Sequence, residues 1–290
     1  MKTLLLTGAG GFLGWNVCLA VNGRWRVYGT LHENGVVPEK CTPVRVDLTN
    51  FRDVTRILKE IRPYGVIHCA AISKPDSCET NPNDAYKINV GATSVLASLC
   101  EELGVRFVFA SSDNVFDGTS PPYSESASVC PINKYGEQKV KAEKEVLRRH
   151  LGALVCRLPL MFGVPSPVSQ CFMQTIIASL KKSKNISLYA DEFRTPASAR
   201  RVAEGLLLGL EGYSGIMHLG GHERISRYEF GVKCAHVWGY DTSLIRAIAQ
   251  RDIITSAPRP KDLSLDSSLA FSRGYAPLTI LEELRLMKKQ

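Results

Sequence analysis

The 290-residue sequence has no long hydrophobic run, no low-complexity segment and no internal repeat. No apolar stretch approaches the roughly 20 residues of a membrane-spanning helix, and the apolar run after Met1 is too short for a signal peptide. Hydrophobic residues make up 44% of the chain and charged residues 22%, which is typical of one large globular domain or two unequal ones. We therefore expect a globular protein with a sizeable core and no membrane partner.

Motifs for metal ligation and disulfide exchange are also missing. The nine cysteines are an odd number, none forms a CxxC pair, and the six histidines have no metal-ligand spacing. Cys18, Cys69, Cys100 and Cys156 lie within apolar segments. This pattern predicts reduced, mostly buried thiols, a cytoplasmic location and no metal site.

Basic residues exceed acidic ones, but they form no nucleic-acid-binding stripe. The chain has 36 Lys and Arg against 28 Asp and Glu, a formal net charge of +8. The basic residues are dispersed and not interleaved with aromatic residues, so we expect no nucleic-acid partner. The charge indicates either attraction of anionic ligands or simply a basic surface.

Short apolar runs alternate with helical patterns through the first half of the chain. The predicted strands are 3–7, 25–30, 44–46, 66–70, 105–110 and 153–156, and the predicted helices are 11–22, 50–61, 84–103 and 131–150. Such alternation predicts an α/β fold with a doubly wound parallel sheet. The later pattern is looser, with helices at 172–180, 198–210, 227–238 and 279–287 and strands at 186–189 and 216–219. We expect one domain over 1–163, to which part of 195–220 returns, and a smaller C-terminal lobe over 164–290.

Three glycines, Gly8, Gly11 and Gly14, follow the first predicted strand and open the first helix. Glycine lets the backbone approach a pyrophosphate, and the N–H groups at the start of a helix can hold phosphates. An ordinary tight turn is the alternative interpretation. The strand–turn–helix context favours dinucleotide binding on a Rossmann fold.

The second strand predicts which dinucleotide binds. NAD-binding proteins usually end this strand with a carboxylate, whereas here it ends in Thr30, followed by Leu31 and His32. NADP(H) is therefore favoured, with NAD(H) as the alternative, although no Arg stands there for a 2′-phosphate. Asp47 and Leu48, after the third strand, are predicted to meet the adenine, with helix capping as the alternative role of Asp47.

Tyr135 and Lys139 lie four residues apart in a predicted helix, and Ser111 and Ser112 end a predicted strand. Residues four apart share a helix face, and a nearby ammonium should lower the pKa of a phenol from its usual value near 10. Tyr135 is thus a candidate proton donor close to the carboxyl edge of the sheet. The alternative is an exposed Tyr on a solvated helix face.

Together these motifs resemble the extended short-chain dehydrogenase/reductase family, and within it the dTDP-4-dehydrorhamnose reductase group. That group also includes the regulatory beta subunit of methionine adenosyltransferase. The likeness extends over essentially the whole chain. The segments that carry it are 7–14, 68–71, 88–90, 111–118, 121–125, 135–139, 157–163, 227–230 and 259–266.

The resemblance implies an NAD(P)-dependent oxidoreductase with a Rossmann domain and a C-terminal substrate-binding lobe. It would reduce a keto group on a nucleotide-activated sugar, as in dTDP-rhamnose biosynthesis. Ser112 would bind the substrate carbonyl with Asp113 beside it, Tyr135 would protonate the alkoxide, and Lys139 would hold the ribose. The implied cofactor contacts are Gly8, Gly11, Phe12, Leu13, Gly14, Thr30, Asp47, Leu48, Cys69, Ala70, Ala71, Tyr135 and Lys139, and the implied substrate contacts are Ser112, Asp113, Leu160 and Arg259.

Three residues depart from the group's pattern: Leu160 replaces a Trp that stacks on the sugar, Asn114 replaces a Tyr, and Arg201 replaces an Asp. Two other functions therefore stay open. One is a nucleotide-sugar epimerase or dehydratase that holds NAD tightly and uses Asp113. The other is a non-catalytic, nucleotide-binding regulatory subunit of a partner enzyme. Arg259 is either a diphosphate ligand or a surface residue, and the resemblance implies a monomer or a homodimer.

Overall fold

The computed structural model describes residues 1–32 and 35–289 and has a seven-stranded parallel sheet at its centre. The strand order is β11-β6-β5-β4-β1-β2-β3, so the α/β fold class predicted from the sequence is confirmed. The bounds are β1 (Lys2–Thr7), β2 (Trp25–Leu31), β3 (Cys41–Arg45), β4 (Gly65–His68), β5 (Arg106–Ala110), β6 (Leu154–Arg157) and β11 (Gly215–His218). The order reverses between β1 and β4, which places a crevice beyond their carboxyl ends.

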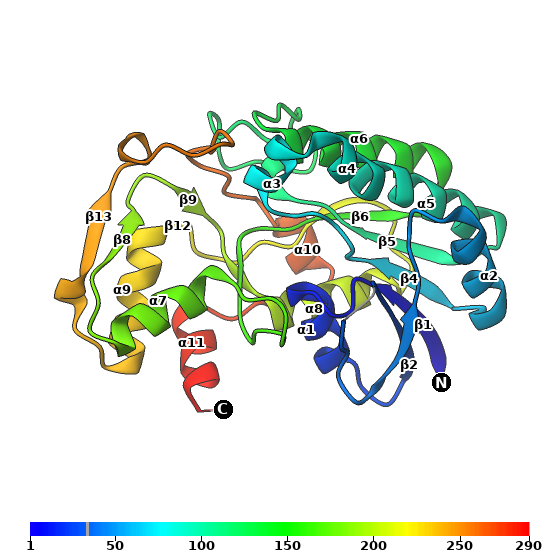
Figure 1. The fold of residues 1–290 in the computed structure, drawn as a ribbon, viewed down its shortest axis with the longest axis horizontal. Helices are drawn as coiled ribbons and strands as arrows, with labels where there is room; N and C mark the ends of the chain where they lie inside the picture. Colours follow the sequence, from blue (N-terminus) through cyan, green and yellow to red (C-terminus); the bar gives the residue numbers. More distant parts are fainter. Residues whose placement is uncertain (33–34, 290) are drawn as a thin grey trace.

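Helices cover both faces of the sheet (Figure 1). One face is covered by α1 (Phe12–Ala20), α8 (Ala199–Gly209) and α10 (Ser268–Ser272), and the other by α2 (Phe51–Ile61), α5 (Thr93–Glu102) and α6 (Lys134–Arg149). Within β1, Leu4 and Leu6 pack toward α1 and α8, whereas Leu5 packs on the opposite side. Because Leu4, Leu5 and Leu6 are all buried although they face alternate sides, the strand has a continuous apolar run.

The segment predicted as one helix over 84–103 is broken in the structure. It contains α4 (Pro82–Tyr86), the π-helical turn η1 (Lys87–Ala92) and α5, and a short helix α3 (Pro75–Thr80) precedes it. The buried Asn89 amide accepts from Ile72 N (2.9 Å) and donates to Ile72 O (3.0 Å). Asn89 lies within the π-helical turn, so the helix departs from regular α-helical geometry where its side chain binds the backbone of Ile72. Hydrophobic periodicity does not reveal such a departure.

The C-terminal lobe packs α7 (Phe172–Lys181), α9 (Arg227–Trp238) and α11 (Ile280–Lys288) around a core containing Phe162, Phe230 and Leu284. Three short pairs of strands complete it: β8 (Ile186–Tyr189) with β13 (Ile245–Ile248), β9 (Phe193–Arg194) with β12 (Ile225–Ser226), and β7 (Met161–Phe162) with β10 (Ala197–Ser198). The 3-10 turns are η2 (Asp113–Val115), η3 (Thr242–Leu244) and η4 (Gln250–Asp252). The two-residue strands were not predicted because they are too short to carry a periodic pattern.

Smaller differences occur at element ends. The first helix ends at Ala20 with Val21 as its C-cap, earlier than the predicted closure at Gly23. The third strand covers 41–45 and tolerates Pro43 because β3 is an edge strand. In the described part of the chain, no helix has both the length and the apolar composition to cross a bilayer.

Candidate functional site

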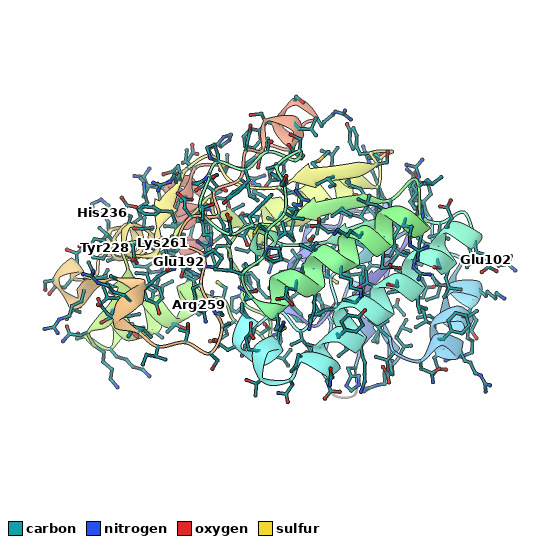
Figure 2. The ribbon with its side chains drawn as sticks, turned by 90° about the horizontal axis from the view of Figure 1, so that it is seen from above. Glu102, Glu192, Tyr228, His236, Arg259 and Lys261 are labelled. Atoms are coloured by element: carbon teal, nitrogen blue, oxygen red, sulfur yellow. The ribbon has the colours of Figure 1, made fainter. Side chains whose placement is uncertain are left out.

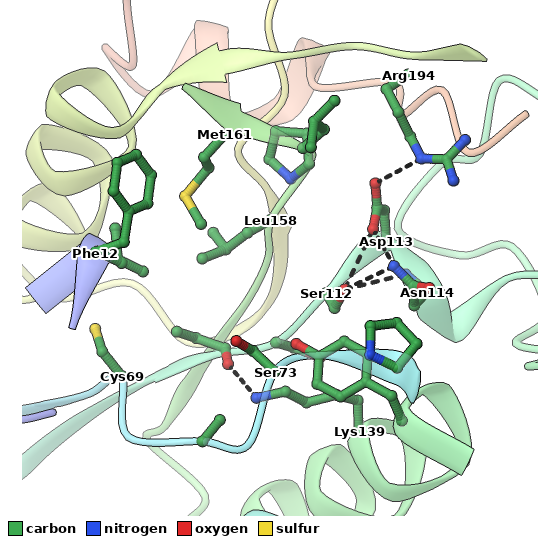
Figure 3. A pocket seen from close by; sticks show the side chains of 18 of the residues that line it. Phe12, Cys69, Ser73, Ser112, Asp113, Asn114, Lys139, Leu158, Met161 and Arg194 are labelled. Carbon is green, nitrogen blue, oxygen red and sulfur yellow. Dashed lines mark hydrogen bonds and ion pairs between the residues drawn. The ribbon is translucent and has the colours of Figure 1, made fainter. Parts of the chain in front are cut away.

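A cavity of about 410 Å³ lies between the carboxyl ends of the central strands and the lobe. It brings together most of the residues singled out in the sequence, and Figure 3 shows part of its wall. These residues are Gly8, Gly11, Phe12, Leu13, Gly14, Cys69, Ala71, Ser112, Asp113, Tyr135, Lys139, Leu160 and Arg259. Thr30, Asp47, Leu48 and Ala70 do not line the cavity.

The glycine turn leaves room for a phosphate group at one end of this cavity. Gly8 has φ +70°, and a Cβ on Gly14 would lie 2.2 Å from Gly8 O, so neither position accommodates a side chain without strain. Helix α1 begins at Phe12 with no side-chain cap and no acidic residue in its first turn. Its first N–H groups are therefore available to an anion, and the residues present fit a dinucleotide pyrophosphate.

Thr30 and Ala70 support the turn from behind. Gly8 N donates to Thr30 Oγ1 (3.3 Å), and a Cβ on Gly8 would lie 2.8 Å from Ala70 Cα. Thr30 and Ala70 thus contact the glycine turn, and their direct contacts with the cofactor stay predictions.

The adenine contacts predicted for Asp47 and Leu48 stay predictions. Asp47 is exposed, and its Oδ1 accepts from Thr49 N (2.9 Å) and Thr49 Oγ1 (2.7 Å). The N-cap of α2 is Asn50, so the alternative role of Asp47 as the helix cap is wrong. Leu48 packs partly against the core under α2 and α5.

Ser112, rather than Ser111, has its hydroxyl available at the cavity. Ser111 Oγ donates to Glu143 Oε1 (2.5 Å), and Glu143 also forms a buried ion pair with Arg157 (2.9 Å). Ser112 Oγ lies 3.2 Å from Asp113 Oδ1 and interacts with the Tyr135 hydroxyl. The two hydroxyls predicted to meet the same substrate oxygen therefore lie together.

Lys139 does not lower the pKa of Tyr135 in this structure, so that expectation from the sequence is wrong. Burial raises the pKa of Tyr135, the hydrogen bond with Ser112 opposes the rise, and Asp113 adds to it. Lys139 Nζ donates instead to Ala110 O (2.8 Å), and burial lowers the Lys139 pKa to about 8. Removal from water disfavours both charged forms, and Tyr135 therefore keeps its proton near neutral pH.

The depressed pKa of Lys139 predicts a pH-dependent stability. Its pKa falls from 10.5 to about 8 on folding, so the unfolded chain binds more protons between these values. The free energy of unfolding of the wild type, minus that of Lys139→Met, should therefore rise as the pH increases from about 8 to about 10.5. Urea unfolding of both proteins across this range measures the difference. A difference that stays flat would contradict a buried Lys139 ammonium.

Asp113 is buried beside Ser112 and linked to the lobe. It accepts from Asn114 Nδ2 (2.9 Å), and its Oδ2 lies 3.6 Å from Arg194 Nε (Figure 3). Burial raises the pKa of Asp113, while Arg194 and the hydrogen bonds from Asn114 and Ser112 lower it. Asn114, which replaces the group's Tyr, thus joins the polar network around the two hydroxyls.

Three charged residues of the lobe were missed by the sequence analysis: Glu192, Arg194 and Arg227 all line the cavity. Glu192 Oε1 lies 2.9 Å from Arg227 Nε and 3.6 Å from Arg194 Nη2. Burial would raise the pKa of Glu192, but Arg227 and Arg194 lower it overall. Only Arg227 had a signal, because it begins a segment that carried the resemblance. Glu192 lies in irregular chain, and Arg194 lies in β9, which is too short to carry a periodic pattern.

Arg259 and Arg201, both noted in the sequence, have different surroundings. Arg259 lines the cavity and its Nη2 lies 2.7 Å from Asp76 Oδ2, so it joins the lobe to α3. Figure 2 shows Arg259 on the same side of the molecule as Glu192 and Lys261, away from Glu102 at the end of α5. Arg201 pairs with Glu283 (2.8 Å) and Glu204 (2.9 Å), which ties α8 to α11 outside this cavity.

Comparison with known proteins identifies the same family that the sequence motifs resemble. The family described as RmlD substrate binding domain matches residues 1–284. Methionine adenosyltransferase 2 subunit beta of Rattus norvegicus is 31% identical over 287 residues, covering 96% of this chain and 84% of that protein. A probable low-salt glycan biosynthesis reductase of Haloferax volcanii is 32% identical over 289 residues, covering 98% and 96%.

A solved structure has the same fold. The dTDP-4-dehydrorhamnose reductase of Bacillus anthracis, crystallised in complex with NADP, superposes with a TM-score of 0.88 at 24% identity over 99% of each chain. The match over almost the whole chain agrees with the motifs that line the cavity. The chain belongs to the RmlD substrate binding domain family, within the extended short-chain dehydrogenases/reductases.

Proposed function

We propose that this protein reduces a keto group on a nucleotide-activated sugar with a nicotinamide cofactor, NADP(H) in preference to NAD(H). The observation that carries the proposal is that one cavity joins the glycine turn to Ser112, Tyr135 and Lys139. Phosphate-binding backbone and a proton donor next to a second hydroxyl are the two parts that such a reduction needs.

The chain's own residues would bind the carbonyl and supply a proton. A bound nicotinamide would supply the hydride. The hydroxyls of Ser112 and Tyr135 orient the carbonyl oxygen, and the protonated Tyr135 Oη transfers its proton to that oxygen. Lys139, whose Nζ lies 5.8 Å from the centroid of the Tyr135 ring, would hold the ribose of the cofactor.

An anionic substrate fits the charge of the cavity wall. The charged lining residues are Lys139, Arg194, Arg227 and Arg259 on the positive side and Asp113 and Glu192 on the negative side. The excess of positive charge favours a ligand such as a nucleotide diphosphate, for which Arg259 is the proposed contact. Leu160 supplies apolar contact to the sugar in place of an aromatic ring.

The preference for NADP(H) rests on the end of β2. The strand ends at Leu31 after the buried Thr30, and no carboxylate precedes His32 to hold a ribose 2′-hydroxyl. The nine cysteines are all free, which supports a cytoplasmic setting for the reaction.

A regulatory subunit is the second candidate function. It is favoured by the 31% identity to methionine adenosyltransferase 2 subunit beta, together with Leu160 where reductases of the group commonly have Trp. Under this proposal the protein would bind the nucleotide without turnover and copurify with a partner enzyme in a fixed ratio. A homodimer without any partner would contradict it.

An epimerase or dehydratase is the third candidate. Asp113 favours it because burial raises the pKa of this carboxyl, which suits an acid beside the catalytic hydroxyl. NAD that copurifies with the protein and resists dialysis would support this reaction over simple reduction.

Turnover with a panel of nucleotide sugars tests the proposal directly. We expect loss of NADPH absorbance with dTDP-4-keto-6-deoxyhexoses or a related nucleotide-sugar ketone. NADP should also raise the melting temperature more than NAD at equal concentration, because tighter binding to the native state stabilises it more. Stabilisation by NADP with no turnover of any nucleotide-sugar ketone would favour the regulatory function instead.

A further inference from the structure

The two halves of the candidate catalytic site come from separate segments that must be held in register. Ser112 and Asp113 follow β5, whereas Tyr135 and Lys139 lie on α6. These segments are in close contact at Gly136, where a Cβ would lie 2.1 Å from Asn114 O. The start of α6 therefore rests directly on η2.

Asn133 connects the segments at this contact. Its Oδ1 accepts from Gly136 N (2.8 Å) and so caps α6. Its Nδ2 donates to Asn114 Oδ1 (3.4 Å), and Asn114 Nδ2 donates in turn to Ser112 Oγ (3.3 Å). A chain of side-chain hydrogen bonds thus runs from the helix that carries Tyr135 to the hydroxyl of Ser112.

The same amide of Asn133 also holds a segment of the lobe. Its Nδ2 donates to Pro258 O (3.1 Å), and Asn133 is only 2% exposed. Pro258 belongs to residues 255–261, here called the strap, which line the cavity with Pro258, Arg259 and Pro260. In Figure 1 the orange chain after β13 leaves the lobe and runs toward α3, where Ala257 N donates to Asp76 Oδ1 (2.9 Å).

We propose that Asn133 is a positioning residue that couples the strap over the cavity to the register of Ser112 and Tyr135. All three of its contacts are made by one buried side-chain amide. The coupling requires no movement of α6 or of the strap. When the strap is bound to Asn133, Asn133 holds the side chain of Asn114, and Asn114 in turn holds the hydroxyl of Ser112 in position. The catalytic part of this inference rests on the proposed function; the structural part does not.

Asn133→Ser separates capping from coupling. Serine is a good N-cap and can still accept from Gly136 N, but it has no amide to donate to Asn114 and Pro258. Asn50→Ser is the matched control, because Asn50 caps α2 in the same way, through Arg52 N (3.1 Å) and Asp53 N (3.4 Å), away from the cavity. Asn114→Ala breaks the link to Ser112 and leaves the bond to Pro258.

The first measurement is hydrogen exchange of the full-length protein without ligands. We expect the Ala257 amide to exchange about two- to tenfold faster in Asn133→Ser and at the wild-type rate in Asn50→Ser and Asn114→Ala. An unchanged rate in Asn133→Ser, or the same acceleration in Asn50→Ser, overturns the coupling. If Asn133→Ser does not fold, Asn133→Asp keeps the cap with a charge that suits a helix start and is measured in the same way.

The second measurement is turnover over a range of pH. Asn133→Ser should lower kcat about ten- to hundredfold and shift the pH limb that reports Tyr135, while the Kd for NADP stays the same. Asn114→Ala should also lower kcat and shift this pH limb. Asn50→Ser should leave kcat and the pH profile unchanged. If Asn133→Ser shows faster exchange of the Ala257 amide but an unaltered pH profile of turnover, Asn133 does not position the catalytic residues. A wild type without turnover overturns the proposed function alone, because the exchange measurement still decides whether Asn133 holds the strap.

Discussion

Tyr135→Phe is expected to lower turnover of a nucleotide-sugar ketone about 10²–10⁴-fold, the usual range for loss of a positioned proton donor. The ring packs against Cys78 and Ala85, and the substitution removes only the hydroxyl that interacts with Ser112. The fold and the affinity for NADP should therefore stay close to those of the wild type. Loss of NADPH absorbance measures turnover, and a thermal shift with NADP measures binding.

Tyr213→Phe is the matched control for this substitution. Tyr213 is partly exposed, its hydroxyl makes only a long contact with Arg273 O (3.4 Å), and it lies outside the cavity. Removal of the Tyr213 hydroxyl should leave turnover unchanged. Full activity of Tyr135→Phe would remove Tyr135 from the reaction and favour an acid such as Asp113. Loss of NADP binding in Tyr135→Phe would indicate a cofactor contact rather than a proton donor.

Gly14→Ala is expected to have the largest effect on cofactor binding. The added Cβ would lie 2.2 Å from Gly8 O and 2.8 Å from Ala9 Cα, and neither backbone atom can rotate away as a side chain could. The start of α1 must then move off the glycine turn, which costs roughly 1–3 kcal/mol of stability or more. The same movement displaces the N–H groups that are proposed to hold the pyrophosphate, so stabilisation by NADP should largely disappear.

Gly23→Ala provides the comparison for Gly14→Ala. A Cβ at Gly23 has no heavy atom within 4 Å, and its φ lies outside the left-handed region. Urea unfolding should give nearly the same free energy for Gly23→Ala as for the wild type, or a slight gain from reduced freedom of the unfolded chain. If Gly14→Ala retained the wild-type thermal shift with NADP, the glycine turn would not be the phosphate site.

The parts of the site that the sequence predicted are encoded locally. A strand, a turn with three glycines and a helix form from neighbouring residues, and Tyr135 and Lys139 share a helix face because of their spacing. Ser112 follows from the same logic, since parallel strands bring their carboxyl ends to one edge. These predictions depended on contacts within single strand–helix units, and the structure brings their residues to one cavity.

The parts that the sequence did not predict depend on distant contacts or on burial. Arg259 pairs with Asp76 across 183 residues, and Arg194 approaches Asp113 from a two-residue strand of the lobe. The pKa of Tyr135 is raised, whereas the prediction was that Lys139 would lower it. Burial of the phenol is the main cause, and burial cannot be read from the spacing of the two residues.

The sequence by itself therefore determined the sheet, the glycine turn and the presence of a phenol and an amine on one helix. Only the tertiary structure decided which charges surround them, that Tyr135 keeps its proton, and that Asn133 joins the strap to Ser112. The reason is physical: propensity and spacing act over a few residues, whereas desolvation and long-range ion pairs exist only once the chain has folded.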